Sequence, residues 1–97
     1  MKSYLLVYNG TQATRRSVTA RIDSMDAIAN WIAFFENALC LVSELNVGEL
    51  TEKIHVAIPD VQFVITPLDK AKKNGWLPKS VWNFMNLPSP VEAESAA

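Results

Sequence analysis

Apolar residues in this chain occur in short dense runs and in stretches with helical spacing. Residues 4–8 (YLLVY) are an aromatic and branched run, and the dipeptide Asn9-Gly10 follows as a turn. This pattern predicts a buried strand. Residues 61–66 (VQFVIT) have the same character and give the clearest strand prediction in the chain, with Pro67 expected to end the strand.

The segment after the first strand has the spacing of a helix with one apolar face. Val18, Ile22 and Met25 recur at positions i, i+4 and i+7. Thr11 or Thr14 would cap the start of this helix. The branched residues in the segment weaken the helix prediction, so a strand stays open as an alternative.

A second helix is predicted to begin at Asn46. Glu49 follows three residues later, which is a capping-box spacing. Leu50 and Ile54 belong to the apolar stripe that comes next. The dipeptide Pro59-Asp60 is expected to end the helix and turn the chain.

Residues 30–45 (NWIAFFENALCLVSEL) permit two interpretations. Their apolar residues fall at helical spacing, but residues 36–37 can equally form the turn of a hairpin between strands at 29–35 and 38–44. A helix that begins at Asn46 requires another element to end just before it. The sequence therefore favours the hairpin, with a single long helix as the alternative.

A short helical segment starting at Pro78 is predicted within WLPKSVWNFMN, since proline is favoured in the first turn. Residues 87–97 hold two prolines, two glutamates and small residues, and are expected to form a loose tail. Residues 1–86, without this tail, are expected to form a single domain. Its order is strand, helix, strand, strand, helix, strand, so the predicted fold class is α+β and ferredoxin-like. A four-stranded antiparallel sheet would carry both helices on one face.

Strands this apolar argue against leaving the other face of the sheet bare, because a large exposed apolar patch usually marks an interface. A second copy of the chain, or the segment around Trp76 and Trp82, would cover it. We therefore expect a homodimer in which Trp76, Trp82 and Phe84 contribute to the interface.

The overall composition narrows the functional classes. The chain has 97 residues, 49% of them hydrophobic, and a formal net charge of -1. One compact domain fits this length, and the charge is neither the basic excess of a typical nucleic-acid binder nor that of an acidic DNA mimic. No apolar run approaches the roughly 20 residues of a membrane span. The N-terminus turns polar too soon for a signal peptide, so a cytoplasmic protein is expected.

The order and spacing of several segments resemble a known family. These segments are YLLVYN, NWIAFFENALCLVS, ELTEKI, FVITPLD and GWLPKSVWNFM, spanning roughly residues 3–86. Together they look like the small dimeric ferredoxin-like proteins related to the CRISPR adaptation nuclease, within the SinR-like branch. The resemblance implies a metal-binding aspartate at the end of the first strand in nuclease-active members. Asn9 stands at that position here, and a neutral amide is a poor ligand for a hard cation such as magnesium.

Candidate chemistry is otherwise sparse. Cys40 is the only cysteine, so no internal disulfide can form, and its apolar surroundings predict a buried, inert thiol. His55 is the only histidine and is expected to be a partly exposed helix residue next to the apolar stripe. Capping and turn roles account best for the four aspartates, which are Asp23, Asp26, Asp60 and Asp69. The sequence predicts no catalytic residue, no metal site and no cofactor.

Basic residues give the only candidate ligand contacts. Arg15, Arg16 and Arg21 lie in the first predicted helix, and Lys70, Lys72 and Lys73 follow the last strand. Solvated surface charge explains them adequately, yet the three arginines are the candidate nucleic-acid contacts. The aromatic residues Trp31, Trp76 and Trp82 can stack on bases or pack in a core.

We therefore expect a homodimeric binding protein that presents its sheet or its first helix to a protein or a nucleic acid. Two alternatives stay open. One is a metal-dependent endonuclease or endoribonuclease of a defence or toxin–antitoxin system. The other is an adaptor or inhibitor of a phage or mobile element.

Overall fold

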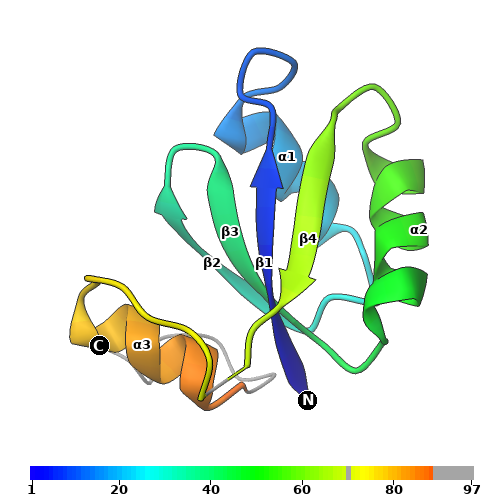
Figure 1. The fold of residues 1–97 in the computed structure, drawn as a ribbon. Coiled ribbons are helices and arrows are strands. Elements are labelled where there is room, and N and C mark those ends of the chain that lie inside the picture. Colours follow the sequence, from blue (N-terminus) through cyan, green and yellow to red (C-terminus); the bar gives the residue numbers. More distant parts are fainter. Residues whose placement is uncertain (70, 89–97) are drawn as a thin grey trace.

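Four strands and three helices make up the computed structural model, which describes residues 1–69 and 71–88. In chain order the elements are β1 (Lys2–Tyr8), α1 (Arg15–Asp23), β2 (Asn30–Phe35), β3 (Ala38–Ser43), α2 (Val47–Ala57), β4 (Phe63–Pro67) and α3 (Lys79–Asn86). The strands form one antiparallel sheet in the order β2-β3-β1-β4. Helices α1 and α2 lie on one face of it (Figure 1). This α+β, ferredoxin-like arrangement confirms the predicted fold class.

The ambiguous central stretch forms a hairpin. β2 and β3 pair antiparallel around the turn at residues 36–37, with an irregularity between Ala33 and Phe35. The turn is also bonded to the end of β1. The Asn37 amide donates to the Tyr8 carbonyl at 3.1 Å, and the Tyr8 hydroxyl donates to the Glu36 carbonyl at 3.0 Å. These bonds attach the hairpin to the central strand, and the single-helix alternative is excluded.

The first two helices carry side-chain caps at their starts, whereas α3 begins after Pro78 without one. Thr14, rather than Thr11, caps α1, because its hydroxyl accepts the Ser17 backbone N–H at 3.1 Å. Asn46 caps α2 by accepting the Glu49 backbone N–H at 2.9 Å. Each cap satisfies one of the backbone donors that a helix start leaves unpaired. The alternative of a strand after residue 11 is thereby excluded.

The last strand differs from its predicted limits. Val61 lies in the turn after α2, where its N–H donates to the Ile58 carbonyl at 3.1 Å, and β4 begins at Phe63. Pro67 does not stand outside the strand but is its final residue, opposite Tyr4. Proline lacks a backbone donor and is tolerated here because β4 is an edge strand with no partner on its outer side.

The main core lies between the sheet and the helix pair α1 and α2. Leu6 on the central strand β1 is fully buried and stands opposite Leu39 and Ile65. Since side chains alternate across a strand, every second residue of β1 reaches this core. Its buried members are Tyr4, Leu6, Tyr8, Val18, Ile22, Ile28, Leu39, Leu41, Leu50, Ile54 and Ile58.

Helix α3 covers one end of the opposite face of the sheet (Figure 1). A second, smaller core forms there from Cys40, Val42, Val81, Phe84 and Met85. The buried Ser3 hydroxyl donates to the Met85 carbonyl at 2.8 Å and fastens the end of α3 to β1. Part of this face is thus covered by the chain's own C-terminal segment, which was one of the two predicted ways to cover it.

The three predicted interface residues have different surroundings in the protomer. Phe84 is only 9% exposed, and Trp82 packs partly buried against the second core. Trp76 precedes α3 and is 99% exposed. Only Trp76 therefore offers its whole side chain to a partner.

The part of this face beyond α3 is uncovered. Its strand residues are uncharged, and Val64 on β4 is 61% exposed. By alternation from the register of the sheet, these residues are Leu5, Val7, Val64 and Thr66. We call this set the open face.

The predicted tail at residues 87–97 falls mostly outside the described residues, because only Leu87 and Pro88 belong to them. Within the described part of the chain, no helix has the length and apolar character needed to cross a membrane.

Candidate functional site

A hollow of about 500 Å³ lies between α1 and the edge strand β2. Helix α1 turns Val18 and Ile22 into the main core. Its residues on the neighbouring side then face the edge of the sheet, because positions three and four apart share one side of a helix. The lining residues are Arg15, Arg16 and Thr19 from α1, with Trp31, Ile32 and Ala33 from β2. We call this the α1–β2 hollow.

The indole ring of Trp31 is held in place at one end of the hollow. Trp31 pairs with Leu41, so its side chain points to the helix side of the sheet, where it packs partly buried against the main core. Its Nε1–H donates to the Asp23 carboxylate at 2.6 Å. Asp23 is the last residue of α1. A charge-assisted bond of this length restricts the orientation of the ring.

The other end of the hollow is positively charged. Arg15 and Arg16 are exposed, and neither forms a salt bridge or hydrogen bond through its side chain within residues 1–69 and 71–88. Both lie in the first turn of α1, which holds no acidic residue. The positive end of the helix dipole adds to the two guanidinium charges. The field extends to Tyr8, where burial raises the pKa of the phenol and the Arg15 charge opposes that rise.

Arg21 is separated from the other two predicted contacts. It lies in the last turn of α1 and does not line the hollow. A cation at that position interacts favourably with the negative end of the helix dipole. The structure therefore brings together two of the three predicted arginines and leaves the third on the surface elsewhere.

The predicted lysines do not extend the basic surface of α1. Lys72 and Lys73 belong to the segment between β4 and α3, and α3 lies across the sheet from the helix pair (Figure 1). Lys73 is engaged there, because its ammonium group donates to the Asn86 side chain. Lys70 lies outside the described residues.

Asn9 has a structural role at the end of β1. Its side-chain oxygen accepts two hydrogen bonds from Thr11, from the backbone N–H at 3.0 Å and from the hydroxyl at 2.7 Å. Its amide donates to the Gln62 side chain at 3.4 Å. The Asn9 side chain thus stabilises the turn that leads to α1. Within the described residues, no group of three or more His, Cys, Asp or Glu side chains is placed to hold a metal ion.

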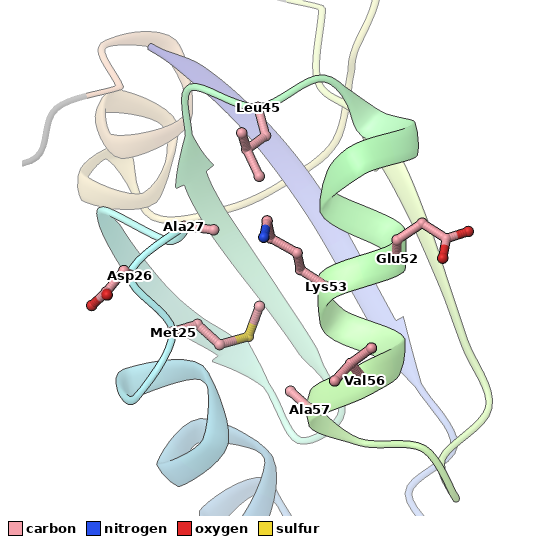
Figure 2. Close-up of a pocket in the computed structure, with 8 residues that line it drawn as sticks. All are labelled: Met25, Asp26, Ala27, Leu45, Glu52, Lys53, Val56 and Ala57. Carbon is pink, nitrogen blue, oxygen red and sulfur yellow. The ribbon is translucent and has the colours of Figure 1, made fainter.

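A second and larger groove, of about 720 Å³, lies between α2 and the connection from α1 to β2 (Figure 2). Its walls are mainly apolar, and the Lys53 side chain extends across it, whereas Asp26 and Glu52 point away. The other lining residues are Met25, Ala27, Leu45, Val56 and Ala57. One lysine and no other inward polar group give this groove little chemistry of its own.

The single cysteine and the single histidine of the chain lie apart from both cavities described above. Cys40 is fully buried in the second core, as predicted, and burial raises the pKa of its thiol to about 12. A thiol that stays protonated is a weak nucleophile. His55 lies on α2, as predicted, and is exposed. Neither residue lines the α1–β2 hollow.

Comparison of the chain with protein-family models, with curated proteins and with solved structures gives no match. The functional reading therefore rests on the geometry of the described residues.

Proposed function

We propose that this protein is a non-catalytic, homodimeric nucleic-acid-binding module that binds phosphates through Arg15 and Arg16. The observation that carries this proposal is the convergence of two unpaired guanidinium groups on one hollow, at the positive end of a helix. Guanidinium groups form bidentate, charge-assisted hydrogen bonds to phosphate oxygens. Contacts of this kind position a nucleic acid without reading its sequence.

A binding role fits the position of Asn9 better than the endonuclease alternative does. The resemblance to CRISPR adaptation nucleases would place a metal at that position, but the Asn9 oxygen is already engaged by Thr11. A hard cation prefers carboxylate and water ligands. We therefore propose that the likeness to that family extends to fold and assembly and not to cleavage.

Removing the two charges tests the phosphate contacts. The double variant Arg15→Gln/Arg16→Gln is expected to bind a short oligonucleotide at least about tenfold more weakly at fixed salt, with a log Kd–log salt slope smaller by about two. Fluorescence anisotropy at several salt concentrations measures both quantities. The slope falls because each lost contact releases one counterion fewer.

Two controls sharpen this measurement. Lys53→Gln/Lys79→Gln removes the same charge from exposed positions away from the hollow, and Arg21→Gln removes a charge elsewhere on α1. Both are expected to bind nearly as well as the unchanged protein. A loss in the double lysine variant equal to that of the double arginine variant, with about half of it for Arg21→Gln, would reduce the effect to overall charge and refute a defined site.

The open face supports the dimer part of the proposal. Its uncharged residues allow two copies to meet about a two-fold axis without opposing like charges. Burying them would remove an apolar surface that α3 leaves accessible. Trp76, which lies in the segment before α3, is available to extend such an interface.

A lysine on the open face is expected to separate the subunits. Val64→Lys places a charge at a position that is 61% exposed in the protomer, so it should raise the dimer dissociation constant about tenfold or more without unfolding the chain. The matched control is Val56→Lys, at a position 78% exposed on α2 on the other side of the sheet. Light scattering would give twice the 10.8 kDa chain mass for the control. A single chain mass for the unchanged protein at all concentrations would refute the dimer.

A further inference from the structure

We propose that the α1–β2 hollow selects single-stranded nucleic acid, with the ring of Trp31 stacking on an unpaired base while Arg15 and Arg16 hold the adjoining phosphates. This inference rests on the proposed function and names its substrate class. It follows from the placement of Trp31 in one cavity with the two arginines, whose side chains have no partner among the described residues.

The hollow has two chemically distinct ends. Asp23, bonded to the Trp31 indole, and the arginines occupy opposite ends of α1, a separation of about 12 Å along the helix axis. A phosphate is attracted to the arginine end and repelled from the Asp23 carboxylate. The sugar-phosphate chain then enters beside α1, and the base points to Trp31. Thr19 lies between the two ends.

The small side chain of Ala33 leaves space for a ring. Ala33 and Trp31 are two residues apart on β2 and therefore lie on the same face of the strand. A larger residue at position 33 would fill the hollow between the indole and the start of α1. The combination of an oriented aromatic ring, adjacent free volume and nearby cations is typical of sites that bind single strands.

Duplexes are excluded by the chemistry of stacking. Inside a double helix both faces of each base are covered by its neighbours, so only the terminal pairs leave a face for Trp31. An unpaired base offers its face and can be splayed out onto an aromatic side chain. Arg15 and Arg16 are assigned to the phosphates, and none of Thr19, Trp31, Ile32 and Ala33 can read a base edge with two hydrogen bonds. The stacking is therefore expected to tolerate any sequence.

The test compares three probes of equal length: an oligothymidylate, the same backbone with abasic sites, and a duplex. The unchanged protein is expected to bind the oligothymidylate at least about fivefold more tightly than the abasic strand, which carries the same phosphates but no bases. Trp31→Leu keeps an apolar side chain against the core and should lose that preference. Trp31→Phe keeps a stacking surface and should retain most of it, which separates stacking from a loss of structure.

A second variant tests whether the free volume of the hollow is needed for binding. Ala33→Leu is expected to fill the hollow and weaken binding of the oligothymidylate about fivefold or more, with little effect on the abasic strand. Circular dichroism and thermal unfolding of each variant check that the fold persists.

The outcomes separate this inference from the proposed function. If binding depends on Arg15 and Arg16 but Trp31→Leu leaves it unchanged, or if the duplex or the abasic strand binds as well as the oligothymidylate, the stacking inference is wrong and the phosphate site stands. If none of the probes binds, the proposed function fails and this inference fails with it.

Discussion

Replacing Phe84 with alanine is expected to lower the free energy of unfolding by about 3 kcal/mol. The Phe84 side chain is 9% exposed and is part of the second core, which includes Cys40 and Val42 of β3. Its removal leaves a cavity beneath α3 that the short helix cannot close. Chemical denaturation at a fixed protein concentration measures the change.

The control for Phe84 is Trp76→Ala. Trp76 is 99% exposed, so its replacement should change the free energy of unfolding by no more than about 0.5 kcal/mol. Light scattering of both variants distinguishes a role within the protomer from a role between subunits. If Phe84→Ala instead dissociates the proposed dimer and leaves the stability of the chain intact, the sequence-based assignment of Phe84 to an interface would be supported.

The second large effect concerns the Cys40 thiol beneath α3. Because Cys40 is fully buried, it should react with a thiol reagent only when the protein opens, at a rate orders of magnitude below that of the unfolded chain. Phe84→Ala should accelerate the reaction by weakening the cover. Equal rates for native and denatured protein would contradict the burial of this side chain.

Cys40 also makes stability depend on alkaline pH. Burial raises its folded-state pKa from the ordinary value of 9.0 to about 12, with a smaller opposing effect from the Lys73 charge. The native state then holds its proton more tightly than the unfolded state. Stability is fully present below pH 9.0 and falls by about 1.4 kcal/mol per pH unit as the pH rises toward 12.

The variant Cys40→Ala isolates the thiol in this pH dependence. Burial likewise raises the pKa values of Tyr4 and Tyr8, so both tyrosines add losses of the same sign. These remain in the variant and cancel when its pH profile is subtracted from that of the unchanged protein. Denaturant unfolding between pH 8 and pH 11 provides the two profiles. Parallel profiles would mean that the thiol does not contribute.

Sequence patterns located most of the fold because the signals act between near neighbours. The capping pair of Asn46 and Glu49 marked the start of α2, and that start in turn favoured a hairpin over a long helix before it. The limits of β4 were harder to predict from the sequence. Whether Val61 pairs or turns depends on the carbonyl of Ile58, and Pro67 is accepted only because its strand lies at the edge of the sheet.

The sequence predicted only part of the candidate site. Arg15 and Arg16 stand out as adjacent charges after a polar loop, and charge alone also selected Arg21, which the helix places outside the hollow. Trp31 was visible as a large aromatic, but nothing in its neighbours linked it to the arginines. The alternation of side chains along β2 would have placed Trp31 and Ala33 on one face once the hairpin was accepted.

Local sequence thus specifies the helices, the turn at residues 36–37 and the alternation of each strand, since these depend on groups a few residues apart. The placement of Arg16 and Trp31 in one hollow, the open face and the burial of Cys40 under α3 arise only when the strands take the order β2-β3-β1-β4. That order depends on how distant apolar surfaces cover one another, and no short segment of the chain encodes it.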